Sequence, residues 1–479
     1  MPGVDAYVAD EILSQQYQTS SDPYDLFSGF TFRSFKENRE ELRIKDDDIP
    51  LGMQRFSTYR RFNAHLFGRK STASNDNILD TLLKRFDNEG MGFAQSPKEV
   101  GTLLVNSFME IVDQITPITL EQVMLKLAES FQRVKNKNDV IHAMEFDPDI
   151  YNSFIKITSF NKAQTKVKMA EESYLQTEGG LLKAGQPISA QPKFMTHLSS
   201  AFNAAIEENI RNDLKRGFYL GYGMNEKELD LLVRESVPVD VPVICAESDI
   251  TQMDSVRGKA TNENFMAKIY DLYGMPHICH KVADTLNAKW VADANTVSLL
   301  VRGRFHSGRF DTLSSNTIVN LALSNYAFKI EKPYLVLAMG DDFAAIADNI
   351  TLVNNFDFLK INFTDIPEFT NNLIGDRLYP SIVKKAGKLL NREFKDAQDL
   401  EAYRYAVKDW IKNYRDTLSM HVICAVNAHK YGIAVEQVQA LWSFLRNFAD
   451  AKIVNTFEDS SLIKYTEVPS LIVDDQPLK

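Results

Sequence analysis

The sequence predicts a globular protein of the α+β class, and three observations support this. Hydrophobic residues make up 44% and charged residues 25% of the 479 residues, which is typical of a chain with a large core in about one to three domains. The short apolar run 241–249 is rich in β-branched residues and predicts a buried strand, and 334–339 predicts a second. Residues 312–328 predict a helix, and the chain from Tyr379 onward is mainly helical.

Further elements are predicted from the periodicity of apolar residues. Helical patterns occupy 78–86, 105–115, 120–134 and 198–214, and a third strand or a helix–strand junction occupies 353–363. The sequence contains no internal repeat and no low-complexity tract.

The composition limits the classes of partner and compartment. The net charge of −10 does not favour nucleic-acid binding by the chain as a whole, so such binding would need a local basic surface. Cys245, Cys279 and Cys424 form neither a disulfide framework nor a zinc spacing, which indicates a reducing compartment. We expect no membrane-spanning helix, because no apolar run reaches about 18 residues, and no secretory signal at the start.

The most informative local feature is Gly340-Asp341-Asp342, which follows the apolar run 334–339. Two adjacent carboxylates at a tight turn repel each other, and a divalent cation relieves that repulsion. Hard cations such as Mg²⁺ bind carboxylate oxygens and often share a site with phosphates. The tripeptide therefore indicates metal-assisted phosphoryl chemistry, with a solvated turn as the alternative.

A second acidic segment lies at the end of the first predicted strand. Glu247 and Asp249 are two positions apart on this strand and therefore point to the same face. Asp254 follows five positions after Asp249. A strand-end carboxylate beside a carboxylate turn is the arrangement of a two-metal site, in which two ions lie about 3.5–4 Å apart. The alternative is that Asp249 caps a helix that begins at Ile250 or Thr251.

A third segment, from Ser307 to Asn320, combines a glycine with a polar stripe. Gly308 allows a close approach of the backbone to a ligand. Thr312, Asn316 and Asn320 are spaced by four and share one face of the predicted helix, with apolar residues on either side. Such side chains carry donors and acceptors suited to a ribose hydroxyl, and a solvated helix face is the alternative.

Together these segments resemble the A, B and C motifs of viral RNA-dependent RNA polymerases. The sequence carries D-x4-D from Asp249, S-G-x3-T-x3-N-T-x2-N from Ser307 and G-D-D from Gly340, in the order of that family. A lone G-D-D is a weak signal, whereas three motifs in order on predicted strands and a helix are specific. The resemblance implies a right-hand polymerase fold of fingers, palm and thumb, in which an antiparallel palm sheet is flanked by helices.

Basic residues extend the resemblance toward the alphavirus-like superfamily of positive-strand RNA viruses. Lys162, Lys166 and Lys168 are spaced for one edge of a β-ribbon, and Lys-x-Gly-Gln-x-Ile-x-Ala at 183–190 follows before Lys193. These segments resemble motif F, the basic finger loop that lines the nucleotide entry channel in the family. For the lysines, an ordinary solvated charge run is the alternative.

Other positions agree with the superfamily in part. Glu247 and the segment 379–388 are similar to it, whereas many relatives continue motif A as Asp-Lys-Ser-Gln where this chain has Asp-Ser-Val-Arg at 254–257. Motif D supplies a lysine general acid in the family but is loosely defined in form. Lys360 is the candidate, with a surface lysine as the alternative.

The resemblance also implies boundaries for the parts of the hand. They are 1–235 for the N-terminal region and fingers, 236–257 for the palm with motif A, 258–303 for a fingers insertion, 304–375 for the palm with motifs B, C and D, and 376–479 for the thumb.

The implied reaction is templated transfer of a ribonucleotide to a primer 3′-hydroxyl, with pyrophosphate as the leaving group. Asp249, Asp341 and Asp342 would hold two Mg²⁺ ions, for which Mn²⁺ can substitute, and Lys360 would be the general acid. The other implied roles are ribose selection by Asp254, Ser307, Thr312 and Asn316, triphosphate and RNA binding by Lys162, Lys166, Lys168 and Lys193, and close backbone approach at Gly308 and Gly340.

The implied partners are template and product RNA, ribonucleoside triphosphates and other viral replicase subunits such as a capping enzyme and a helicase. We expect the host cytoplasm as the location, in a replication complex that reaches membranes only through partners. A reverse transcriptase-like polymerase is one alternative, although Met339 stands where that class has an aromatic residue. A non-catalytic RNA-binding replication protein is the other, and the intact carboxylates argue against it.

Overall fold

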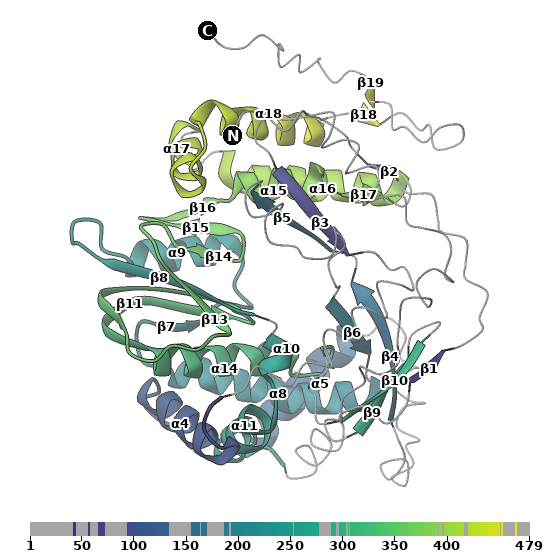
Figure 1. Ribbon diagram of the computed structural model, residues 1–479, viewed down its shortest axis with the longest axis vertical. Helices are drawn as coiled ribbons and strands as arrows, with labels where there is room; N and C mark the ends of the chain where they lie inside the picture. Colours follow the sequence, from purple (N-terminus) through teal and green to yellow (C-terminus); the bar gives the residue numbers. More distant parts are fainter. Residues whose placement is uncertain are drawn as a thin grey trace.

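The computed structural model (Figure 1) describes three long stretches of the chain, interrupted by short gaps, together with isolated strands. The long stretches are 93–133, 193–251, 253–276, 305, 307–390, 392–394, 397–415 and 420–450. The strands outside them are 42–44, 56–57, 66–71, 155–162, 164–169, 186–190, 289–293, 297–302, 452–453 and 465–466. Within these residues no helix is long and apolar enough to cross a membrane.

A five-stranded sheet forms the centre of the molecule. Its strands, in spatial order, are β13 (Leu359–Phe363), β8 (Ile244–Ile250), β12 (Asp342–Leu352), β11 (Phe328–Met339) and β7 (Phe218–Leu220). All neighbours pair antiparallel except β7, which runs parallel to β11. The α+β class is confirmed, but the sheet is mixed rather than antiparallel. In the sequence, the edge strand β7 lies between two helices and is not joined to β11 by a hairpin turn. The parallel pairing with β11 is therefore possible.

Different elements cover the two faces of this sheet, as the alternation of side chains requires. Helix α14 (Thr312–Ala327) packs on one face, against residues that include Val336, Ala338 and Phe343, and α4 (Pro97–Glu110) packs in turn against α14. Helix α9 (Glu226–Ser236) and a small sheet pack on the other face, against residues that include Leu335, Leu337 and Ala344. The small sheet contains β14 (Glu368–Phe369), β15 (Asn372–Ile374) and β16 (Leu378–Pro380).

Helix α14 is buried on nearly every side, including its polar residues. Such a helix has no solvated face, so the alternative of a solvated polar stripe is wrong. It matches the predicted 312–328 to within one residue, because Phe328 already begins β11. Helix and strand therefore join without a loop, which fixes the position of α14 relative to the end of β11.

Most other predicted elements are also present. The predicted 120–134 and 198–214 correspond to α5 (Leu120–Arg133) and α8 (Lys193–Asp213). The predicted 105–115 belongs to α4, which begins earlier because Ser96 and Glu99 form a capping box ahead of Pro97. The predicted helix at 78–86 lies outside the described residues.

The segment after motif A differs from one of the expectations. Asp249 lies within β8, and the next helix, α10 (Met253–Val256), begins four residues later. The alternative that Asp249 caps a helix at Ile250 or Thr251 is therefore wrong. Three short elements follow: α11 (Lys259–Thr261), η3 (Asn262–Met266) and α12 (Ala267–Leu272).

The lysines of the predicted β-ribbon lie on strands of two different sheets. Strand β4 (Ile155–Lys162) belongs to a sheet with the order β1 (Leu42–Ile44), β10 (Val297–Arg302), β9 (Lys289–Asp293), β4 and β6 (Gln186–Ala190). Strand β5 (Gln164–Met169) pairs instead with β3 (Leu66–Ser71). The two strands diverge after Lys162 because each finds a partner far away in the sequence.

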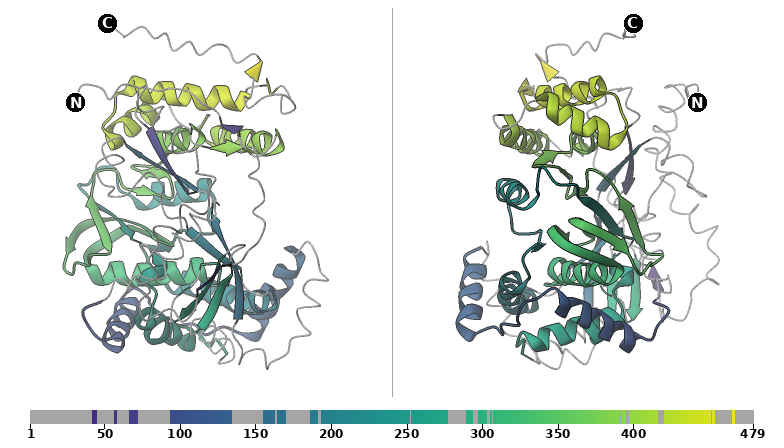
Figure 2. Two further views of the ribbon diagram at one scale, coloured as in Figure 1. Left: turned by 45° about the vertical axis from the view of Figure 1, so that its right-hand side comes forward. Right: turned by 90° about the vertical axis from the view of Figure 1, so that its left-hand side faces the viewer.

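Four helices near the end of the chain form a second core. They are α15 (Ile382–Leu390), α16 (Ala397–Arg415), α17 (Met420–Tyr431) and α18 (Val435–Asp450). Figure 2 shows them at the same end of the molecule in both further views. Strands β3 and β5 contact α15. Two short pairs complete the structure, β17 (Glu393–Phe394) with β2 (Phe56–Ser57), and β18 (Lys452–Ile453) with β19 (Tyr465–Thr466).

One ion pair joins this helical end to the central sheet. Lys430 Nζ on α17 donates to both carboxylate oxygens of Glu247 on β8, each at 2.9 Å. Glu247 also accepts from Asn362 Nδ2 at 2.8 Å and from the backbone N–H of Glu368 at 2.6 Å. The Lys430 and Glu247 side chains are 10% and 20% exposed, so the pair is largely removed from water.

We predict that Lys430→Met lowers the free energy of unfolding by about 1–3 kcal/mol, because the Glu247 carboxylate stays largely buried with its charge uncompensated. Urea unfolding measures the change. Lys329→Met is the matched control, since Lys329 pairs with Glu331 in an exposed position and its loss should change stability little. Equal changes in the two variants would show that the junction is no stronger than a surface pair.

Candidate active site

Three predicted site residues lie opposite one another across three strands. Asp342 on β12 pairs in register with Asp249 on β8, and Asp249 pairs in register with Lys360 on β13. Residues directly opposite on antiparallel strands share a face, with Cβ atoms about 4.5–5.5 Å apart. Asp249 and Lys360 are exposed and Asp342 is half-buried. The sheet thus brings two carboxylates and a lysine together at the end of these strands.

The third carboxylate, Asp341, lies in the turn between β11 and β12. Met339 pairs with Asp342, so Gly340 and Asp341 form a two-residue hairpin loop. Gly340 is the first central residue of this turn. Its φ of +61° is the conformation that a type II′ turn requires at that position, and it favours glycine. An added Cβ would meet the nearest atom, Leu313 Cδ1, only at 3.7 Å, so backbone conformation rather than space requires the glycine.

Helix α14 holds this turn with two side chains. The N–H of Gly340 donates to Thr317 Oγ1 at 2.9 Å. Asn320 Nδ2 donates to the carbonyl oxygens of Gly340 and Asp342, at 3.0 and 3.1 Å. Sequence reasoning quoted both residues in motif B but assigned neither this role. Their spacing of three places them on one side of a helix, which was the available signal.

The carboxylates interact electrostatically. Burial, followed by the charges of Asp341 and Asp249, raises the pKa of Asp342 to about 6, while Lys384 acts in the opposite direction. Among the described residues, no three acidic, histidine or cysteine side chains form a ready-made metal cage. Mg²⁺ is commonly held by one or two carboxylates together with substrate phosphates, so this donor set fits a hard divalent cation.

The loop before α14 has a fixed shape. Gly308 has φ +97°, which favours glycine, and its N–H donates to Thr312 Oγ1 at 3.2 Å. The Thr312 hydroxyl in turn donates to the carbonyl oxygen of Arg309 at 3.0 Å. Ser307 is buried. The Thr312 hydroxyl therefore already shapes the loop, in addition to any contact with a ligand.

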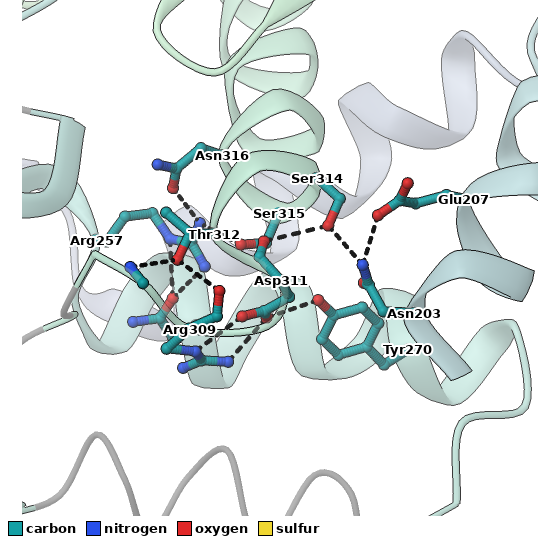
Figure 3. Close-up of polar contacts among 12 residues, drawn as sticks. Asn203, Glu207, Arg257, Tyr270, Arg309, Asp311, Thr312, Ser314, Ser315 and Asn316 are labelled. Carbon is teal, nitrogen blue, oxygen red and sulfur yellow. Dashed lines mark hydrogen bonds and ion pairs between the residues drawn. The ribbon is translucent and has the colours of Figure 1, made fainter. Parts of the chain in front are cut away.

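Asn316 is buried one helical turn further along, where Arg257 Nη1 donates to its Oδ1 at 2.7 Å (Figure 3). The next residue, Thr317, contacts the Gly340 turn. Asn316 is therefore adjacent in α14 to the residue that holds the turn, and its role in ribose selection stays a prediction.

Other predicted site residues are placed only by their backbone. Asp254 lies in α10, and its side chain is outside the described part of the structure. Lys162 ends β4, whereas Lys166 and Lys168 lie in β5. Lys193 begins α8. The side chains of these four lysines are likewise outside the described part.

The sheet, the paired aspartates and the helix beside their turn agree with a comparison against protein families. The family described as RNA dependent RNA polymerase matches residues 64–453. This chain belongs to that family, whose members are nucleotidyltransferases. The predicted enzyme class and the resemblance to alphavirus-like polymerases are thereby confirmed.

Similar proteins include non-structural polyproteins pORF1 of hepatitis E viruses. The polyprotein of avian hepatitis E virus (isolate Chicken/California/Meng) is 23% identical over 394 residues, covering 78% of this chain and 24% of the polyprotein. That of hepatitis E virus genotype 1 (isolate Human/Burma) is 24% identical over 391 residues, covering 78% and 22%. The chain thus spans about a quarter of the length of these relatives.

We predict that Asp342→Asn stabilises the metal-free protein at neutral and alkaline pH. Because the fold raises the pKa of Asp342 to about 6, folding takes up a proton between about pH 4 and 6. The free energy of unfolding therefore falls as the pH rises through this window. The substitution should remove a penalty of about 1–3 kcal/mol near pH 8, and the gain should shrink toward pH 4. Thermal unfolding with a chelator present measures it.

Asp348→Asn is the control on the same strand. Hydrogen bonds from Lys332 and Tyr334 hold the pKa of Asp348 below its usual value, so this substitution should not stabilise the protein. Identical melting temperatures of Asp342→Asn and the unchanged protein at about pH 8 would contradict repulsion among the carboxylates.

Proposed function

We propose that this chain catalyses templated RNA synthesis for viral genome replication and transcription, at the carboxylate site at the end of β8 and β12. The observation that supports this most directly is the in-register pairing of Asp249 with Asp342 beside the Asp341 turn. Three carboxylates from two motifs meet there, and burial together with their repulsion raises the pKa of Asp342. Two Mg²⁺ ions, or Mn²⁺ in their place, are the proposed cofactors, held by these three aspartates.

We also propose that the molecule has the right-hand arrangement. The central sheet corresponds to the palm, and the helices α15 to α18 correspond to the thumb. The sheets that contain β3 to β6 correspond to the fingers, and the contact of β3 and β5 with α15 supports fingers that reach the thumb. The boundaries 1–235, 236–257, 258–303, 304–375 and 376–479 remain predictions. Strand β7, at 218–220, lies in the predicted fingers but belongs to the central sheet.

In the proposed reaction, the primer 3′-hydroxyl attacks the α-phosphate of a ribonucleoside triphosphate and pyrophosphate leaves. Bound divalent cations would lower the pKa of the attacking hydroxyl and neutralise charge on the leaving group. Asp249 and Asp342 face the reacting phosphates from neighbouring strands, and the clamped turn presents Asp341 beside them. Lys360 Nζ, on the strand next to Asp249, donates a proton to the departing pyrophosphate oxygen.

Residues of motifs A and B select ribose in this proposal. Asn316 contacts the 2′-hydroxyl, and Asp254 of motif A and Ser307 in the loop before α14 are the further proposed contacts. Thr312 contributes by shaping that loop at Gly308. A site built to hydrogen-bond a hydroxyl rejects a ligand that lacks it, because buried polar groups are then left unpaired.

The remaining binding roles follow from charge. The basic residues that bind triphosphate and RNA are Lys162, Lys166, Lys168 and Lys193. A local basic channel of this kind allows RNA binding although the net charge of the whole chain is −10. Template and product RNA and ribonucleoside triphosphates are the proposed ligands. Capping and helicase subunits are proposed partners, since the relatives are much longer polyproteins. We place the protein in the host cytoplasm, in a replication complex that reaches membranes through those partners.

Asp341→Asn should reduce nucleotide incorporation on the order of 100-fold or more, because a metal ligand supplies several kcal/mol of transition-state stabilisation. Primer extension on a homopolymer template with ribonucleotides measures this, and RNA binding should be largely unchanged. Asp376→Asn, away from the carboxylate site, is the matched control. Extension by Asp341→Asn at the original rate would exclude the two-metal assignment.

Asn316→Ala should lower the preference for ribonucleotides over 2′-deoxynucleotides by about tenfold, the value of one well-made hydrogen bond. The measurement is kcat/KM for both substrates opposite the same template base. If the unsubstituted protein uses 2′-deoxynucleotides as readily as ribonucleotides, that result would instead favour a reverse transcriptase.

A further inference from the structure

A buried arginine links motif A to motif B. Arg257, directly after α10, is 1% exposed and is among the largest fully buried side chains of the described residues. Its Nε and Nη2 donate to Asn262 Oδ1 at 2.9 and 2.6 Å. Its Nη1 donates to Ser315 Oγ at 2.9 Å and to Asn316 Oδ1 at 2.7 Å. A buried guanidinium is costly unless its donors are satisfied, so these bonds hold the side chain in one place.

The surroundings of Arg257 make this position more rigid. The guanidinium carbons of Arg257 and Arg309 lie 4.3 and 4.8 Å from the centroid of the Phe305 ring. Arg309 makes two bonds of 2.8 Å to Asp311, which also accepts from Tyr270 OH at 2.8 Å. Figure 3 shows this network beneath the start of α14. Stacking and charge compensation together leave the guanidinium little freedom to turn away from Asn316.

The chemistry of the guanidinium determines which way the Asn316 amide points. Arginine carries only donors, so the atom that faces it must be the amide oxygen. The Nδ2 group of Asn316 then points the other way, and it makes no hydrogen bond with another described residue. Asn316 directly precedes Thr317, the residue that accepts a hydrogen bond from the Gly340 turn.

We propose that Arg257 is a positioning residue for ribose selection: it fixes the Asn316 amide so that Nδ2 is presented as a donor to the 2′-hydroxyl oxygen. This rests on the proposed polymerase function. Without Arg257 the amide can turn over, and the site no longer offers a fixed donor whose loss penalises deoxynucleotides. The role also gives a reason for arginine at 257, where the resemblance led us to expect glutamine. The arginine side chain is longer than that of glutamine, so its guanidinium reaches both Asn262 and α14.

The test compares kcat/KM for a ribonucleoside triphosphate and its 2′-deoxy analogue opposite one template base. Arg257→Met should lower the ratio about tenfold, through a higher KM for the ribonucleotide and with little change in its kcat. Arg257→Lys keeps a charged donor near the amide oxygen and should retain most of the preference. Ser315→Ala removes the other acceptor of the same nitrogen and should leave the ratio unchanged. An equal loss in Arg257→Met and Ser315→Ala would overturn the proposal in favour of a general packing role.

A double substitution separates this inference from the function beneath it. In the Asn316→Ala background, Arg257→Met should lower the ratio no further. If Asn316→Ala itself leaves the ratio unchanged, the ribose-reading role of Asn316 fails. If Asn316→Ala lowers the ratio and a folded Arg257→Met does not, only the positioning role of Arg257 fails.

A further variant covers the case in which Arg257→Met does not fold. Asn316→Asp keeps the acceptor for Arg257 and removes the outward donor. We expect an unchanged or higher melting temperature together with a loss of the ribose preference. An undiminished preference in this variant would overturn the assignment of Nδ2 as the selecting donor.

Discussion

The structure depends on one electrostatic constraint, which is that three mutually repelling carboxylates must stay together at one end of the central sheet. The β8–β12 pairing sets Asp249 opposite Asp342, and the tight turn adds Asp341. Burial and the neighbouring charges raise the pKa of Asp342, so the arrangement opposes folding at neutral pH. The turn backbone donates a hydrogen bond to Thr317 and accepts hydrogen bonds from Asn320, and these bonds offset part of that cost and fix where the charges lie. A site strained in this way is suited to bind cations.

The same requirement explains why a helix with so many polar residues is buried. Thr317 and Asn320 of helix α14 hold the turn. Asn316, one residue before Thr317, accepts a hydrogen bond from Arg257. The helix therefore couples the carboxylate site to the proposed sugar site. Because Phe328 begins β11 directly after α14, a shift of the helix would move the turn as well. The proposed ribose selection and the proposed metal binding would thus be parts of one rigid unit.

The helical end of the chain is tied to the same sheet by charge. Lys430 meets Glu247 two residues before Asp249, and Lys384 pairs with Glu368 at 2.6 Å while acting on Asp342. Two lysines from the C-terminal helices therefore reach the acidic edge of the sheet. These charged contacts supplement the small sheet, which contributes buried apolar residues both to the helical core and to the cluster on the central sheet.

The sequence alone determined the chemistry: Asp249, Asp341, Asp342 and Asn316 were predicted because their motifs are local, and local spacing can be recognised in a single chain. Helix α14 and strands β8 and β11 followed from periodicity for the same reason. Tertiary structure decided what depends on distant partners. It placed β7 parallel to β11, separated β4 from β5, and joined Arg257 to Asn316 and Lys430 to Glu247. These contacts connect segments tens to hundreds of residues apart, and only the packing of the whole chain selects among such pairings.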